Sequence, residues 1–106
     1  MSDGFALVVR FTLRDESAAA KFDELCARTL PGIKAKEPGT LAYVTHTPEG
    51  EPLVRVFYEL YADRAAFDAH ETQPHTKNFL AERDQYLSGV EVSFLDMNAG
   101  KVAEGQ

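Results

Sequence analysis

Near its start, the chain carries a strict alternation of large apolar residues with smaller or polar ones. The run is FALVVRFTL, and every second side chain from Phe5 to Leu13 is large and apolar. A period of two residues predicts a β-strand with one buried face. That face needs a second layer packed against it, so the fold must combine a sheet with covering helices or with another sheet.

The following segment has helical spacing. Asp15 can cap a helix of about 20 residues, and Pro38-Gly39 can close it. Pro31 falls inside this helix, where a proline removes a hydrogen bond, so we expect a kink or break there. The apolar face is formed by Ala18, Phe22, Leu25, Cys26, Thr29 and Ile33.

Two β-rich runs come next, Thr40–Thr47 and Leu53–Tyr61, joined by the turn-forming linker PEGEP. Their spacing predicts an antiparallel hairpin. Asp63 can then cap a short helix, and Pro74 can open a second one. We expect that second helix to end at Ser88-Gly89.

Residues Val90 to Met97 complete the pattern as a last strand, with Val90, Val92 and Phe94 facing inward. The order β-α-β-β-α-β predicts an α+β fold of the ferredoxin-like kind, with helices on one face of a four-stranded antiparallel sheet. With 106 residues and 44% hydrophobic content, the chain has enough core for one domain. We place this domain at residues 1–97 and expect a flexible tail at 98–106.

A second apolar face runs along the first three predicted strands. Helices of the same chain cannot cover both faces of one sheet, so we expect a homodimer in which two sheets pack back to back. His46 should lie on this side and is not a site candidate. The second face comprises Ala6, Val8, Ala42, Val44, Val54, Val56, Tyr58 and Leu60.

Charge and cysteine content narrow the partners and the compartment. Eleven Lys and Arg against 17 Asp and Glu give a net charge of −6, and the basic residues are scattered. Such a chain repels phosphate backbones, so nucleic acid and anionic membranes are not expected partners. Cys26 is the single cysteine, and the N-terminus lacks a signal-peptide pattern, so we expect a cytoplasmic protein.

Several side chains could carry chemistry. Glu59 lies within an apolar strand, where a carboxylate needs a raised pKa or a partner such as Arg55 or a second subunit. His70 and His75 could exchange protons near neutral pH, although a histidine at a helix end is often only a cap. Residues that could form an aromatic pocket with one cation are Tyr43, Phe57, Tyr61, Phe67, Phe79 and Arg83.

Two segments carry a family resemblance. EPGTLAY (Glu37–Tyr43) and VFYELYADRAAFDAHETQPH (Val56–His75) resemble the antibiotic biosynthesis monooxygenase family, in its E-x-G, aromatic-Glu and A-H-x-x-x-P-H elements. The resemblance implies a dimeric α+β barrel and places Glu59, His70 and His75 at a catalytic pocket. It implies a cofactor-independent monooxygenase acting on a quinol or polycyclic phenol with dioxygen. The same superfamily leaves two alternatives: an isomerase or degradative enzyme on a small carbonyl compound, as in its autoinducer-degrading branch, and a non-catalytic binding dimer.

Signatures of metal and cofactor binding are missing from the sequence. His70 and His75 are five residues apart, which does not match the helical zinc pair at i and i+4. No Gly-rich phosphate loop or nucleophile elbow occurs. Haem-degrading relatives carry Asn on the first strand and Trp and His on the helices; here those positions fall near Val9 or Arg10, His70, and Phe79 or Leu80. We therefore expect no metal and no cofactor.

Overall fold

The computed structural model describes residues 4–102. The elements are β1 (Phe5–Leu13), α1 (Glu16–Lys36), β2 (Thr40–His46), β3 (Val54–Tyr61), α2 (Arg64–Thr72), α3 (Pro74–Arg83), the short 3₁₀ helix η1 (Asp84–Tyr86) and β4 (Leu87–Asp96). The expected α+β ferredoxin-like order is confirmed. Within the described residues, every helix is too short or too polar to cross a membrane.

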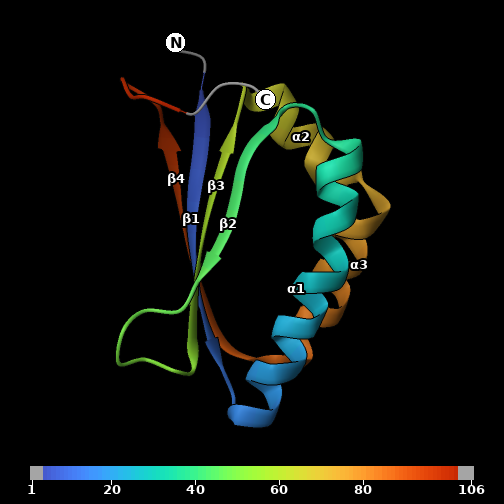
Figure 1. The fold of residues 1–106 in the computed structure, drawn as a ribbon, viewed down its shortest axis with the longest axis vertical. Coiled ribbons are helices and arrows are strands. Elements are labelled where there is room, and N and C mark those ends of the chain that lie inside the picture. The colour runs from blue at the N-terminus through green and yellow to red at the C-terminus, as the bar shows by residue number, and fades with distance from the viewer. Residues whose placement is uncertain (1–3, 103–106) are drawn as a thin grey trace.

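The four strands form one antiparallel sheet in the order β2-β3-β1-β4. All the helices lie on one side of it, as Figure 1 shows, and the other side carries no helix. The alternating strand β1 lies inside the sheet, where Val9 pairs with Phe57 of β3 and with Val92 of β4. Its large side chains therefore form the floor of the core beneath the helices.

The helices begin where the sequence predicts. Asp15 and Asp63 accept hydrogen bonds from the amides of Ala18 and Ala66, each at 2.8 Å, and so cap α1 and α2. Pro74 occupies the start of α3, where its missing N–H costs nothing.

Two details of the helices differ from the expected ones. The break expected at Pro31 does not occur: helix α1 continues to Lys36, because its buried face, including Phe22, Leu25 and Ile33, packs on the core and holds it in place. Helix α3 ends at Arg83 and does not reach Ser88. Leu87 instead starts β4 by pairing with Leu13 of β1, so sheet pairing overrides the local helical pattern.

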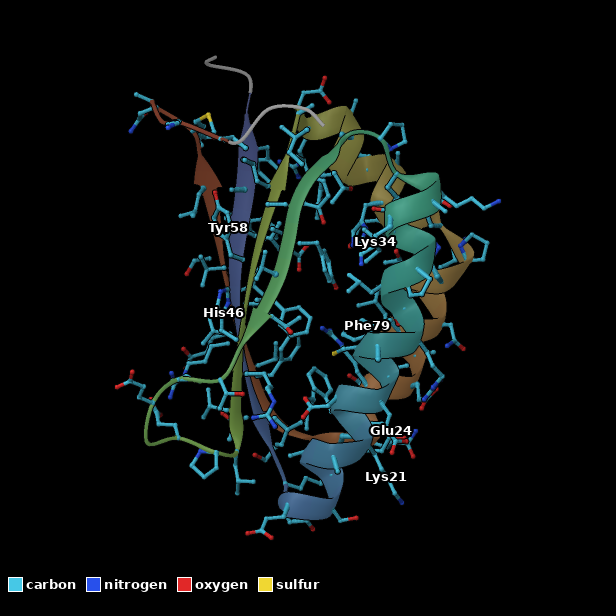
Figure 2. All side chains as sticks on the ribbon, viewed as in Figure 1. Lys21, Glu24, Lys34, His46, Tyr58 and Phe79 are labelled. Carbon is cyan, nitrogen blue, oxygen red and sulfur yellow. The ribbon has the colours of Figure 1, made fainter. Side chains whose placement is uncertain are left out.

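The side of the sheet without helices is partly apolar, as expected. Tyr58 and His46 lie on this side, whereas Phe79 lies between the sheet and the helices (Figure 2). Val44 is 46% exposed, but Ala6 and Leu60 are buried even in the single chain. Residues Asp96 to Val102 line a cavity together with Ala6 and Leu60, so the segment after β4 covers one end of this face.

Strand β4 is an outer strand, and the helices leave much of it uncovered. By register, Val90, Val92 and Phe94 share the helix side of the sheet with Phe11, Val9 and Leu7, as predicted. They nevertheless remain 43%, 46% and 60% exposed. The space between sheet and helices is therefore open along β4.

Candidate functional site

A cavity of about 260 Å³ lies between the sheet and helices α2 and α3. Six of the residues predicted for the site line it, together with side chains of β1 and β4. Phe57 and Tyr61 do not line it, because both are fully buried in the core. His75 is likewise absent from its wall. The predicted residues in the wall are Tyr43, Glu59, Phe67, His70, Phe79 and Arg83.

A wider cleft of about 510 Å³ lies between α1 and β2, but two of its polar side chains, Arg55 and Cys26, are not in a reactive state. The Arg55 guanidinium already donates to both carboxylate oxygens of Asp23 and to the carbonyls of Pro52 and Val54. Burial raises the pKa of the Cys26 thiol to about 12, so it stays protonated at neutral pH. The smaller cavity is therefore the better site candidate.

Glu59 enters the cavity wall from β3 and is 6% exposed. Its carboxylate accepts a hydrogen bond of 2.6 Å from the hydroxyl of Tyr61. The expectation that Arg55 pairs with Glu59 is wrong, because Arg55 is bound to Asp23. Burial raises the pKa of Glu59, and the hydrogen bond from Tyr61 offsets only part of that effect. The expectation of a raised pKa is confirmed in direction.

The two tyrosines near Glu59 stay neutral. Burial is the largest cause that raises the pKa of both Tyr43 and Tyr61, and the nearby Glu59 carboxylate adds to it. Their rings pack near His70, with ring centroids 5.6 and 5.4 Å from the imidazole. The imidazole thus contacts two neutral aromatic rings.

His70 lies on α2, is 5% exposed and contacts a carboxylate that sequence reasoning assigned no role. Its Nδ1 is 2.8 Å from Oε1 of Glu37, which ends α1. Nε2 of His75, at the start of α3, is 2.5 Å from Oε2 of the same carboxylate. Thr40 also donates its hydroxyl to Oε1 of Glu37, at 2.7 Å. One buried carboxylate therefore joins both predicted histidines.

A local signal could have identified Glu37. The carbonyls at the end of a helix carry partial negative charge, which disfavours a carboxylate there. Glu37 nonetheless directly follows the last helical residue, after Lys34 and Lys36 in the last turn. A lone carboxylate at such a position, immediately before Pro-Gly, needs a partner elsewhere in the fold.

Arg83 brings a cation to the cavity wall. Its guanidinium carbon lies 5.5 Å from the centroid of the Phe11 ring. Its Nε is buried and makes no hydrogen bond within residues 4–102. The Asp84 carboxylate is 3.5 Å away but 77% exposed, and the geometry does not make it an acceptor. The guanidinium as a whole lines the cavity and brings a positive charge that can attract an anion or a carbonyl oxygen.

The cavity thus combines an apolar, largely aromatic wall with one imidazole, the two carboxyl groups of Glu59 and Glu71, and one guanidinium. In the part of the chain that the structure describes, no cluster of three or more His, Cys, Asp or Glu side chains could hold a metal ion. The arrangement can hold a flat apolar molecule, remove a proton from it and stabilise a developing oxyanion.

The model of the antibiotic biosynthesis monooxygenase family matches residues 4–82. The chain belongs to this family. The match includes β1 through α2, all of α3 except its last residue, Arg83, and every candidate residue of the cavity up to Leu80. A comparison with curated proteins finds no significant match.

Solved structures share the family fold. Rv0793 from Mycobacterium tuberculosis is 26% identical, with a TM-score of 0.83 over 92% of this chain and 97% of its own. A Caulobacter crescentus protein that bears the family's name is 24% identical, with a TM-score of 0.85 and 92% of both chains covered. SnoaB from Streptomyces nogalater, a cofactor-independent oxygenase solved as a mutant, is 20% identical, with a TM-score of 0.79 over 92% of this chain and 96% of its own.

Proposed function

We propose that this family member is a cofactor-independent monooxygenase that oxidises a quinol or polycyclic phenol with dioxygen. The observation that carries the proposal is His70, a buried imidazole held by a carboxylate in the wall of an aromatic cavity. Family membership and the likeness to SnoaB, itself a cofactor-independent oxygenase, support the reaction class.

Such a substrate supplies its own electrons. A base removes the proton of a hydroxyl group, and the electron-rich anion then reduces dioxygen. For an anthrone, the ring CH₂ becomes a carbonyl: one oxygen atom enters the product, the other leaves as water, and all four electrons come from the substrate. The apolar wall, with Phe67 and Phe79, would keep water away from the reactive anion.

We assign His70 as the base in preference to Glu59 or His75. No residue among 4–102 forms a hydrogen bond with Nε2 of His70, so this nitrogen is available to a ligand in the cavity. Glu59 already accepts the Tyr61 hydroxyl, and its raised pKa makes its charged form harder to keep. His75 does not line the cavity.

Arg83 would hold the oxyanion. Its guanidinium lines the cavity and can donate to the phenolate or carbonyl oxygen, and its positive charge favours the anion. Tyr43, Phe67 and Phe79 would pack on the rings of the substrate. The cavity opens along β4, where Phe94 is 60% exposed, which gives a flat molecule a route inward.

The test is oxygen uptake by the purified, colourless protein on a panel of hydroquinones and anthrones. Wild-type protein should consume oxygen in proportion to its concentration. His70→Asn should lower kcat by about 10²- to 10⁴-fold, the usual contribution of a general base. Glu24→Gln, an exposed change in α1 away from the cavity and from the open side of the sheet, is the control and should keep its rate.

No protein-dependent uptake across the panel would overturn the monooxygenase. The same cavity could abstract a proton next to a carbonyl, with Arg83 holding the enolate oxygen, as an isomerase requires. Oxygen separates the two functions, because an isomerase would turn over small carbonyl compounds equally well in anaerobic buffer. Binding without any turnover would indicate a non-catalytic binding protein.

We also propose that the protein is a cytoplasmic homodimer. The support is the open side of the sheet, where Val8, Ala42, Val44, Val56 and Tyr58 are half-buried or exposed in the single chain. A contiguous apolar patch of this kind is usually covered in solution.

A further inference from the structure

Glu37 is a carboxylate in an unfavourable place. It ends α1, where the helix dipole opposes a negative charge, and its side chain is only 3% exposed. Burial of an unpaired carboxylate would be strongly unfavourable. The position is therefore tolerated only because hydrogen-bond donors surround it.

Three donors satisfy this carboxylate. The Thr40 hydroxyl and His70 share Oε1, and His75 binds Oε2. An ionised carboxylate can only accept hydrogen bonds. Both imidazoles must therefore direct an N–H at Glu37, which places a proton on Nδ1 of His70 and on Nε2 of His75.

The position of the proton on His70 determines which nitrogen the cavity receives as a base. A neutral imidazole carries one proton, so a proton on Nδ1 leaves Nε2 with a free lone pair. That nitrogen has no protein partner within residues 4–102, and the ring lines the cavity. Were Glu37 absent, the remaining partner of Nδ1 within residues 4–102 would be the Thr76 hydroxyl at 3.4 Å, which can donate or accept and so does not fix which nitrogen holds the proton.

We propose that Glu37 and His75 are positioning residues for His70: Glu37 keeps the proton on Nδ1 and the basic Nε2 toward the cavity, and His75 holds the second carboxylate oxygen in place. The role in turnover rests on the proposed function. The role in fixing the protonated nitrogen does not, because it concerns the chain without substrate.

The packing around His75 supports its role in holding Glu37, because the fold leaves a defined space for the His75 ring. A Cβ added to Gly32 of α1 would lie 2.5 Å from Nδ1 of the His75 ring, so only glycine leaves room for the imidazole there. Just after α1, a Cβ on Gly39 would lie 2.6 Å from that of Ala66. The end of α1 thus fits closely against α2 and α3, with Glu37 between their two histidines.

The direct test is the ¹⁵N spectrum of the ring nitrogens in wild-type protein, recorded without substrate at a pH where His70 is neutral. The expected result is a protonated Nδ1 and an unprotonated Nε2 for His70, and the reverse for His75. A neutral His70 with its proton on Nε2 would overturn the proposal. In Glu37→Ala, His70 should lose its single preferred form, while Glu24→Gln, an exposed change in α1, should leave it unchanged.

The kinetic test uses the substrate found by oxygen uptake. Glu37→Gln should lower kcat by about 10- to 100-fold with little change in KM, since the base is misdirected but the binding wall is intact. His75→Gln, which can still donate to Glu37, should retain more activity than His75→Ala. Equal rates for wild type and His75→Ala would overturn the role of His75.

These outcomes separate the two proposals. If wild-type protein shows the expected ring protons but no oxygen uptake, the proposed function fails and the positioning role stands. If uptake occurs but Glu37→Gln and His75→Ala leave kcat unchanged, the positioning role fails and the monooxygenase stands. Should Glu37→Gln not fold, the wild-type spectrum and the two His75 variants still decide.

Discussion

Among single residues, Glu59 makes stability depend on pH in a defined direction. Its pKa in the folded chain is raised above the ordinary 4.5, mainly by burial. Between the two values the folded chain binds more protons than the unfolded chain, so this residue's contribution to stability falls as the pH rises through that window. The contribution is fully present below 4.5 and is lost above the folded pKa.

Glu59→Gln should therefore gain stability over wild type as the pH rises. Glutamine cannot ionise and can still accept the Tyr61 hydroxyl, so the difference in Tm should grow from pH 4.5 upward and become constant above the folded pKa. Thermal unfolding followed across this range measures it. Glu24→Gln, at an exposed site, should show no such trend. A difference that is flat or shrinks with pH would refute the raised pKa.

The sequence identified some site residues and not others, for physical reasons. Glu59 stood out because a charge in an apolar strand is costly, and the two histidines because they match a family pattern. Glu37 was missed as their partner because its contacts cross 33 and 38 positions of sequence. Phe57 and Tyr61 have the predicted orientation, but neighbouring side chains bury both completely, so neither reaches the cavity.

At the level of elements, α1 contains an internal proline that does not interrupt it but lowers its stability. Pro31 is exposed and lacks the N–H that would bond to the helix turn before it. A proline inside a helix costs about 3 kcal/mol relative to alanine. Its rigidity in the unfolded chain offsets only about 0.4–1 kcal/mol of this.

Pro31→Ala should therefore stabilise the protein by about 2 kcal/mol and raise Tm by on the order of 10 °C. Because the side chain is exposed, the change removes no core packing. Thermal and urea unfolding measure the gain, with Lys21→Ala in the same helix as the control. An unchanged Tm would mean that the proline makes compensating contacts.

Element boundaries show the limits of local patterns. The strand at Phe5–Leu13 was predictable to the residue because its alternation is complete and both neighbours in the sheet reinforce it. The end of α3 was not predictable from the sequence, because Leu87 has helical spacing with Phe79 and Leu80 but pairs with Leu13 in the sheet. Only the folded sheet supplies that competing partner.

At the level of the whole molecule, the open side of the sheet predicts an obligate dimer. Val56 lies near its middle, opposite Arg10 of β1 and His46 of β2. If two sheets pack there, the buried area should exceed roughly 2,000 Å². Val56→Asp would then place a charge in a dry interface, at a cost of several kcal/mol.

The expected result for Val56→Asp is unfolded or aggregated protein, because the monomer should not be stable alone. Light scattering at micromolar concentration gives the mass of the wild type, which should be twice that of one 11.7 kDa chain. Lys21→Asp, at an exposed position of α1, is the control for a charge change and should remain a dimer. A wild-type mass equal to that of one chain would contradict the dimer. It would show that the segment after β4 covers enough of the apolar side of the sheet.

The position of β1 also sets an order of events during synthesis. Of the four strands β1 is made first, yet one of its two neighbours, β4, is the last of the four, and Phe5 pairs with Asp96. Closing so long a loop is entropically costly and slows folding. Until β4 arrives, a nascent chain holds one edge of its most apolar strand unpaired, and an unpaired apolar edge is a site where strands of other chains can add.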